Sequence, residues 1–357
     1  MKERLLQWLQ CPECRGSLSL EVRQCAGQEI TEGSLRCRCG RLFPIIRGVP
    51  RFLPEELRHE LPKYYPEFNG CNLNSMRGEK FVRRDVDNIK SSTLSRFGYE
   101  WNHFRDYDCK NFEAFTAPMP VDFFRGKIGL DVGCGAGRHS KAASELGAEM
   151  VAIDLSAAVD AAYLNNAKNE CVHVVQADIY KLPIKDNSFD FIFSLGVLHH
   201  LPDPELGYRL LIPLLNEGGA LFVWVYAYAV RKVALELLRF ISQRLSNANI
   251  ARMAYLCNLV DYGVFVNLYR LLSVLPRVGS LVRNCSPLRI KEYARHGFKV
   301  GYTDWFDRLS APISNYYKRH EMLEWLERSQ LSNTRLNSVE DSWWWLYGER
   351  KAPCLIC

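Results

Sequence analysis

Residues 130–138 have the sequence Leu130-Asp131-Val132-Gly133-Cys134-Gly135-Ala136-Gly137-Arg138. The apolar start of this run is typical of a short buried strand, and the glycines predict a tight turn into a helix. Glycines let the backbone pass close to a ligand where a Cβ would collide. The helix that follows offers free N–H groups to a polar part of that ligand. Asp131 precedes the turn and can face a donor or a positive charge, so we expect a nucleotide-like ligand with a cationic part.

The spacing of the glycines distinguishes between cofactors. A dinucleotide fingerprint, G-x-G-x-x-G, would place its third glycine at position 138, where Arg138 stands. Glycines at 133, 135 and 137 favour the methyl donor S-adenosylmethionine over NAD. The alternative is a tight strand-to-helix turn that binds no ligand.

From residue 126 the sequence alternates between strand and helix patterns, which predicts an α/β fold with a doubly wound, mostly parallel sheet. Strands are expected at Ile128–Val132, Glu149–Asp154, 171–176, 189–194 and 220–226, and helices at 138–146, 157–167 and 204–215. Residues 231–285 are expected to be helical, residues 321–329 to form another helix, and residues 342–350 to return to the sheet.

Acidic side chains follow two of these strands, and two histidines follow a third. Open parallel sheets bind ligands outside the carboxyl ends of their strands. Asp154, next to Leu155, is placed to accept both ribose hydroxyls of a nucleotide, and Asp178 to accept from an adenine amino group while Ile179 packs on the ring. The next strand ends at Ser194 and leads to His199 and His200, beside the same crevice.

This ordered series resembles the class I S-adenosylmethionine-dependent methyltransferases, particularly the group related to the ubiquinone-biosynthesis methyltransferases, over residues 128–226. The resemblance implies a Rossmann-like fold in which Asp131 and the glycine turn hold the methionine portion. It also implies that Asp154 binds the ribose, that Asp178 and Ile179 bind the adenine, and that backbone near Ser194 contacts the amino acid end.

Methyl transfer is an in-line displacement on an activated donor, so the protein mainly supplies proximity and orientation. A base is needed only where the acceptor must lose a proton, and His199 and His200 are the candidates. The alternative is that the histidines merely cap the following turn. Aromatic residues 97–104, before the first strand, could close over the cofactor or acceptor, or pack as a plain helix.

Two cysteine pairs lie near the N-terminus, Cys11-Pro12-Glu13-Cys14 and Cys37-Arg38-Cys39. Four thiolates suit a tetrahedral structural zinc ion. The segment resembles the zinc-ribbon domain that serves as the small activator subunit of eukaryotic methyltransferases. The second pair is C-x-C where C-x-x-C is usual, so a fold with buried cysteines and no metal stays open. Some RNA guanine methyltransferases carry such a ribbon, but residues 1–60 are nearly neutral, with ten basic and eight acidic residues.

The 357-residue chain divides into a cysteine-bearing module over residues 1–55, a linker with short helices over 56–125, and a methyltransferase domain over 126–357. Pro62, Pro66, Pro118 and Pro120 are expected to interrupt any long helix in the linker. Thirteen cysteines, an odd count, argue against a disulfide framework, and the first ten residues lack the apolar region of a signal peptide. A cytoplasmic location is therefore expected.

Residues 226–300 carry twelve basic and three acidic residues, a net charge of 12 − 3 = +9. The apolar stretches within 227–300 predict a helical insertion after the fifth strand. Asp261, Asn267 and Arg270 make it a poor transmembrane span. A cap on the catalytic domain, a homodimer seam, contact with a membrane surface or lipid-linked acceptor, and contact with RNA phosphates are the alternatives.

We therefore expect a methyltransferase that uses S-adenosylmethionine, carries zinc, and acts on a small or lipid-linked metabolite. Ser194-Leu195-Gly196-Val197 stands where an N-P-P-Y motif for amino groups would lie, which favours O- or C-methylation. The alternatives are an RNA base methyltransferase and a non-catalytic cofactor-binding interaction partner.

Overall fold

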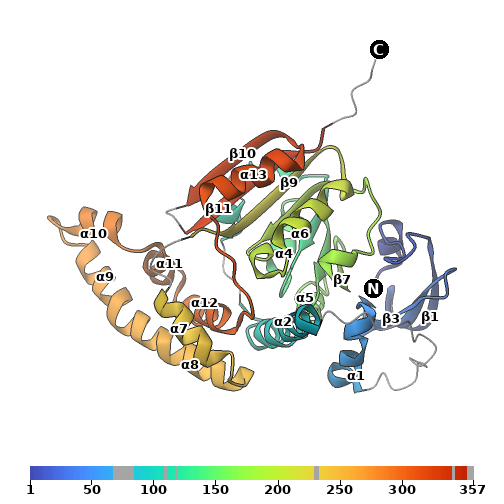
Figure 1. The fold of residues 1–357 in the computed structure, drawn as a ribbon, viewed down its shortest axis with the longest axis horizontal. Coiled ribbons are helices and arrows are strands. Elements are labelled where there is room, and N and C mark those ends of the chain that lie inside the picture. Colours follow the sequence, from blue (N-terminus) through green and yellow to red (C-terminus); the bar gives the residue numbers. More distant parts are fainter. Residues whose placement is uncertain (67–83, 108–110, 117–118, 229–232, 340–341, 352–357) are drawn as a thin grey trace, which may run out of the picture.

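A computed structural model describes residues 1–66, 84–107, 111–116, 119–228, 233–339 and 342–351. Its strands form one eleven-stranded sheet in the order β1-β2-β3-β4-β7-β6-β5-β8-β9-β11-β10. The N-terminal strands continue this sheet at one end, and a group of helices projects from the molecule at the other (Figure 1).

The centre of the sheet is parallel, as the alternating pattern predicts. Its five strands are β5 (Ile128–Val132), β6 (Glu149–Asp154), β7 (Val172–Ala177), β8 (Phe189–Leu195) and β9 (Leu215–Tyr226). The helices α4 (Arg138–Glu145), α5 (Ala158–Asn165) and α6 (Pro204–Leu211) connect them. The expected return to the sheet is β11 (Trp343–Glu349), antiparallel to β9. Two differences are that β9 begins at Leu215 and that β10 (Ser332–Val339), which follows α13 (Arg319–Ser329), was not expected.

The sheet is covered on both faces because successive residues of its strands point in opposite directions. Along β6, Val151 and Ile153 belong to one hydrophobic cluster, whereas Met150 and Ala152 belong to the other. All four side chains are buried. This double burial explains why the central strands read as nearly continuous apolar runs.

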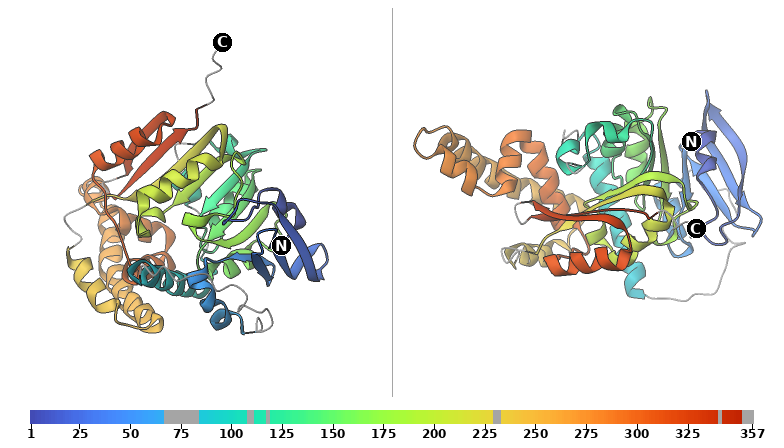
Figure 2. Two further views of the ribbon diagram at one scale, coloured as in Figure 1. Left: turned by 45° about the vertical axis from the view of Figure 1, so that its right-hand side comes forward. Right: turned by 90° about the horizontal axis from the view of Figure 1, so that it is seen from above.

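The cysteine-bearing module is joined to the parallel sheet by strand pairing. It contains β1 (Leu18–Ala26), β2 (Glu29–Cys37), β3 (Leu42–Ile46) and β4 (Val49–Phe52), which pair in antiparallel order. Strand β4 also pairs in parallel with β7, through Arg51 opposite Gln176 and Phe52 opposite Ala177. Figure 2 shows the module seated against the edge of the parallel sheet.

An ion pair between the fully buried Arg51 and the partly exposed Asp160 fixes this junction. The Arg51 guanidinium lies 2.6 Å from Oδ1 of Asp160 on α5, and it also donates to the Tyr65 hydroxyl and to Oε1 of Gln176. The module is therefore an extension of the sheet, whereas the domain division at residues 55 and 125 stays a prediction.

Residues 56–125, which were predicted to form a linker with short helices, contain a long helix. The prediction that this segment has no long helix was therefore wrong. Helix α2 spans Arg84–His103 and lies between the prolines at 66 and 118, which therefore do not interrupt it. The short helices α1 (Leu61–Tyr64) and α3 (Phe112–Phe115) are the other α-helices of this region that the structure describes. Short 3-10 turns occur at Glu3–Gln7, Glu55–Glu60, Val121–Phe124, Ile179–Lys181, Leu198–His200 and Ile212–Leu214.

The predicted helical insertion follows β9 and extends to Ser310. It comprises α7 (Val233–Ser242), α8 (Asn247–Val260), a π-helical turn (Asp261–Val266), α9 (Asn267–Ser273), α10 (Gly279–Cys285), α11 (Leu288–His296) and α12 (Phe298–Ser310). Helices α9 and α10 reach furthest from the sheet (Figures 1 and 2). Among the described residues, none of the helices has the length and apolar character that crossing a membrane requires.

Candidate cofactor site and cysteine cluster

The glycine turn connects β5 to α4 at the point where the order of the parallel strands reverses, between β5 and β8. Gly133, Gly135 and Gly137 have φ angles of 81°, 52° and 76°, which residues with a Cβ rarely adopt. A Cβ on Gly133 would also lie 2.3 Å from the Val197 side chain. The reversal of strand order is where open α/β sheets place their ligand crevice.

Asp131 and Asp154 flank this turn on the adjacent strands β5 and β6. Asp131 is buried, and its Oδ2 accepts a hydrogen bond from Ser140 Oγ at 2.6 Å. Burial raises the pKa of Asp131 to about 7. Asp154 accepts from the Gly135 N–H at 3.0 Å and from the Ser156 N–H at 2.8 Å, and burial raises its pKa as well. The two acids thus lie at one crevice.

Asp178 follows β7 and is 1% exposed. Its Oδ1 accepts from the Tyr180 N–H at 3.0 Å, and its Oδ2 lies 2.5 Å from Lys90 Nζ of α2. The next residue, Ile179, is buried. Leu155 is half-buried and packs against a separate apolar cluster that includes Leu94 of α2. Sequence reasoning missed Lys90, because its partner is far away in the chain.

Ser194, His199 and His200 lie at and after the end of β8. The Ser194 hydroxyl donates to the Val132 carbonyl at 2.9 Å and so ties β8 to β5. His199 is fully buried with its ring centroid 3.9 Å from that of Tyr226. His200 Nδ1 donates to the Ile313 carbonyl at 2.7 Å, which leaves Nε2 facing Asp307 Oδ1 at 3.9 Å.

Burial lowers the pKa of His200, although Asp307 opposes this shift. A neutral imidazole with Nδ1 as donor has its lone pair on Nε2, which is the form that a proton acceptor needs. The structure therefore brings His200 together with Asp307 of α12, whereas the role of either histidine as a base stays a prediction.

Residues 97–103 of the aromatic segment belong to α2, and Phe104 follows directly after it. The segment covers the carboxyl edge of the sheet. A Cβ on Gly135 would meet Trp101 Cε2 at 2.9 Å, so the indole lies directly against the glycine turn. Asn102 Nδ2 donates to the Ala157 carbonyl at 2.9 Å, and the Phe97 ring centroid lies 5.2 Å from that of His200. Helix α2 thus contacts the glycine turn, the start of α5 and the segment that follows β8.

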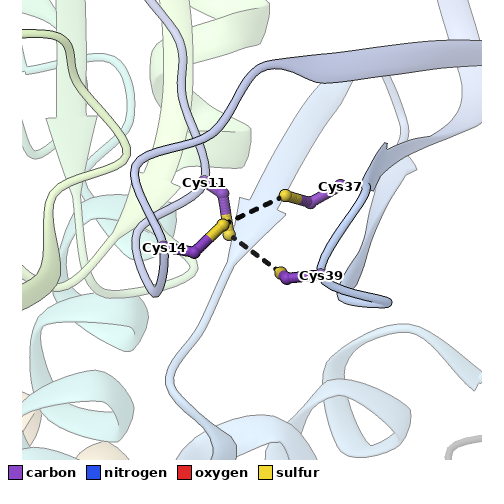
Figure 3. Close-up of side chains that lie close together, drawn as sticks. All are labelled: Cys11, Cys14, Cys37 and Cys39. Carbon is purple, nitrogen blue, oxygen red and sulfur yellow. Dashed lines mark hydrogen bonds between the residues drawn. The ribbon is translucent and has the colours of Figure 1, made fainter.

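The four predicted metal ligands come together at the end of the N-terminal module. The Sγ atoms of Cys11, Cys14, Cys37 and Cys39 all lie within 4.8 Å of one another (Figure 3). The Cys14–Cys37 and Cys11–Cys39 sulfur distances are 3.3 and 3.7 Å. Tetrahedral zinc with Zn–S bonds of about 2.3 Å would separate its sulfurs by about 3.8 Å. The donor set therefore fits zinc, and the C-x-C spacing brings both of its sulfurs into the cluster.

Local backbone structure holds these thiols in place. Two turns are closed by hydrogen bonds from the Arg15 N–H to the Cys11 carbonyl and from the Gly40 N–H to the Cys37 carbonyl. A Cβ on Gly16 would lie 3.3 Å from Cys14 Sγ, so the chain passes close beside the cluster. Burial raises the pKa of Cys11 to about 12, whereas a backbone hydrogen bond from Arg41 lowers that of Cys39 to about 7.

Two separate stretches of the chain match known protein families. The family described as "Methyltransferase domain" matches residues 130–223, and the family described as "Trm112p-like protein" matches residues 2–48. A ubiquinone biosynthesis O-methyltransferase of Xanthomonas campestris is 32% identical over 151 residues, which cover 38% of this chain and 61% of that protein. The chain thus spans less than two thirds of this curated relative.

Two solved structures are also similar. One is a complex of the Haloferax volcanii Trm112 methyltransferase activator with a methyltransferase, at 22% identity and a TM-score of 0.30 over 40% of this chain and 61% of that one. The other is a Burkholderia thailandensis 1,6-didemethyltoxoflavin-N1-methyltransferase, at 13% identity and a TM-score of 0.45 over 78% and 94%. With the family matches and the sheet order in place, the chain joins an N-terminal segment similar to the Trm112p-like family, residues 2–48, to a segment similar to the methyltransferase-domain family, residues 130–223.

Proposed function

We propose that this protein transfers the methyl group of S-adenosylmethionine to a small or lipid-linked acceptor. The observation that carries the proposal is the glycine turn between Asp131 and Asp154 at the reversal of strand order. Asp131 would face the methionine portion and Asp154 the ribose. Asp178 and Ile179 would contact the adenine, while backbone near Ser194 would contact the amino acid end.

The methyl donor, when bound, supplies an activated carbon, so the protein's task is to orient donor and acceptor and to exclude water. Helix α2 would provide the cover through Trp101 and Phe97. His200 Nε2 would take the proton of an acceptor that must lose one. Cys11, Cys14, Cys37 and Cys39 would hold a structural zinc ion, because all four coordination positions would be filled by thiolates.

The insertion supports a lipid-linked acceptor. Most of the large apolar side chains that are exposed in the described residues lie between Leu237 and Leu281. Along the continuous helix formed by α8, the π-helical turn and α9, they recur on one face at helical spacing: Leu256, Val260, Val264, Leu268 and Leu271. Leu275, also exposed, follows just beyond the end of α9. An exposed apolar stripe of this length marks an interaction surface.

The charge near this stripe favours an anionic membrane surface as its partner. Residues 244–285 contain five arginines, at 244, 252, 270, 277 and 283, which are all exposed. The single acid of the same stretch, Asp261, is buried against Trp305 and Arg289. Apolar side chains combined with arginines are what binding at a lipid interface uses. The enzyme would then reach an acceptor held in or at the membrane.

Incubation with donor labelled in its methyl group and a fractionated cell extract tests the proposal. We expect label in the small-molecule or lipid fraction, and none with an Asp154→Ala variant. Label found in RNA alone would contradict it and favour the RNA alternative. Donor binding without transfer to any fraction would favour the non-catalytic alternative. Alkaline hydrolysis of the labelled product distinguishes a methyl ester from a C-methyl group.

A further inference from the structure

A buried carboxylate without a hydrogen-bonding partner lies beside the candidate cofactor site. Glu100 of α2 is 0% exposed, and within the described part of the chain neither of its carboxylate oxygens has a hydrogen-bond partner. Leaving an ionised carboxylate in this state is costly, and buried polar groups are nearly always paired in folded proteins. Glu100 therefore indicates a ligand that supplies what the chain does not.

The position of Glu100 follows from its neighbours on the helix. Trp101 lies against the glycine turn, Phe97 lies against His200, and Asn102 bonds to the start of α5 directly after the Asp154 loop. Glu100 stands on the same turn of α2 as Phe97 and Trp101. It is close enough to Asp154, Asp304 and Asp307 to interact with their charges. It thus faces the boundary between the cofactor crevice and α12.

The charges of the two α12 carboxylates near Glu100 are compensated by neighbouring groups, whereas the carboxylate of Glu100 has no such partner among the described residues. Asp304 pairs with Arg308 at 2.8 Å and accepts a hydrogen bond from Tyr293. Asp307 accepts from the Tyr226 hydroxyl at 3.0 Å and faces His200. Burial and the three acids Asp307, Asp304 and Asp154 all raise the pKa of Glu100. These effects favour the protonated carboxyl, and a cation arriving in the crevice would favour the ionised form instead.

We propose that Glu100 is the residue that faces the sulfonium charge of the methyl donor, at the border with the acceptor. This inference rests on the proposed function. A carboxylate close to a fixed positive charge in a buried site strengthens the binding of that charge about tenfold to a hundredfold. The charge leaves the sulfur when the methyl group is transferred, so the demethylated product, S-adenosylhomocysteine, would lose this contact and dissociate more readily.

The same electrostatics restricts what Glu100 can do for the rate. The sulfonium charge is already present in the ground state and becomes more dispersed as the methyl group moves. Glu100 would therefore strengthen donor binding more than it stabilises the transition state. We expect Glu100 to determine affinity and the discrimination between donor and product.

The test compares the binding of S-adenosylmethionine and S-adenosylhomocysteine to the full chain by calorimetry. For Glu100→Gln we expect affinity for S-adenosylmethionine to fall about tenfold or more, with affinity for S-adenosylhomocysteine within about twofold of the unaltered protein. Asp87→Asn, on the same helix, is the matched control and should change neither. Both ligands carry the ammonium and the ribose, so the affinity ratio isolates the sulfonium.

The remaining outcomes separate the two proposals. Equal losses for both ligands, or no loss for either, would overturn the assignment of Glu100 and leave the proposed function standing. Failure of the unaltered protein to bind S-adenosylmethionine would overturn the proposed function, and this inference with it.

A second measurement on the unaltered protein applies if Glu100→Gln does not fold. The affinity ratio of donor to product should rise with pH as Glu100 ionises, and a ratio independent of pH would overturn the proposal. Asp154, Asp304, Asp307, His200, Arg308 and Tyr226 face the same region. Asp131, which titrates near pH 7, would affect both ligands alike through their shared ammonium.

Discussion

Lys90 Nζ lies 2.5 Å from Asp178 Oδ2, and this pair fastens α2 to the strand end that is expected to receive the adenine. Both side chains are largely buried, with 12% and 2% of their side-chain surface exposed. Breaking such a pair from one side leaves the other charge without compensation. The contact therefore couples the position of the covering helix to the state of the cofactor site.

Lys90→Met should destabilise the protein more than Asp178→Asn does. Asp178 cannot reach water when Lys90 is removed, so we expect a loss of about 3 kcal/mol in the free energy of unfolding. Lys90 retains some access to solvent, so Asp178→Asn should cost roughly half of that but weaken donor binding. Urea unfolding of both variants and of the double variant measures the coupling. If the two single variants lost the same free energy of unfolding and the double variant lost their sum, Lys90 and Asp178 would not stabilise the protein as a pair.

The titration of Asp131 should make the stability of the protein depend on pH. Its pKa rises from 3.8 to about 7 on folding, so the folded state binds the proton more tightly than the unfolded state. Stability from this group is fully present below pH about 4 and is lost as the pH rises through about 7. The total change is at most about 4 kcal/mol.

Asp131→Asn keeps the shape of the protonated carboxyl and removes the titration. We expect the variant to be more stable than the parent at pH 8, equally stable at pH 4, and weaker in donor binding. Thermal unfolding across this pH range gives the difference. Other buried acids contribute equally to both proteins, so the quantity to compare is the stability of the variant minus that of the unaltered protein. If this difference did not change with pH, Asp131 would not have the raised pKa.

Zinc should bind in a ratio of about one ion per chain and support the N-terminal module. Cys14→Ser should abolish stoichiometric zinc and lower the unfolding temperature. Cys25→Ser, an exposed cysteine of β1 outside the cluster, is the control and should leave both unchanged. Elemental analysis of protein purified without added zinc decides the matter. A metal-free protein that keeps its unfolding temperature in the presence of a chelator would rule out the structural zinc site.

Vesicles containing an anionic lipid should bind the protein through the stripe on α8 and α9. We expect replacement of Leu256, Leu268 and Leu271 together by serine to reduce co-sedimentation about tenfold or more, because each buried leucine contributes on the order of 1.5 kcal/mol or more. Leu164→Ser is the control, since Leu164 is 60% exposed but lies on α5. Added salt should weaken binding. Binding to neutral lipid alone, or a dimer that dissociates in the triple variant, would indicate a different partner.

The parallel sheet could be predicted from sequence because its strands are apolar and its loops carry glycine and acidic residues at fixed places. Ile128–Val132 and Glu149–Asp154 are strands with the expected bounds. Helix α2 escaped prediction because its sequence is strongly polar, and because Leu94, Phe97, Trp101 and Phe104 make only a narrow apolar face. Strand β10 is largely exposed and has no apolar alternation.

The candidate site was predictable only in part for a related reason. Asp131, Asp154 and Asp178 stand at the carboxyl ends of strands, so topology alone brings them to one edge. Lys90 and Glu100 reach the same edge from a helix that is far away in the sequence. The residues that they contact depend on how α2 packs against the sheet. The spacing of apolar residues within α2 does not indicate where that helix will pack.

The parallel pairing of β4 with β7 has a consequence for synthesis on the ribosome. Arg51 and Gln176, which meet in that pairing, are separated by 125 residues in the chain. At about 5–20 residues per second, the partner strand emerges roughly 6–25 s after β4. During that interval the module has an open strand edge and an arginine without its aspartate. The cysteine cluster lies wholly within the first 39 residues, so the proposed zinc ion would stabilise the nascent module before the rest of the sheet exists.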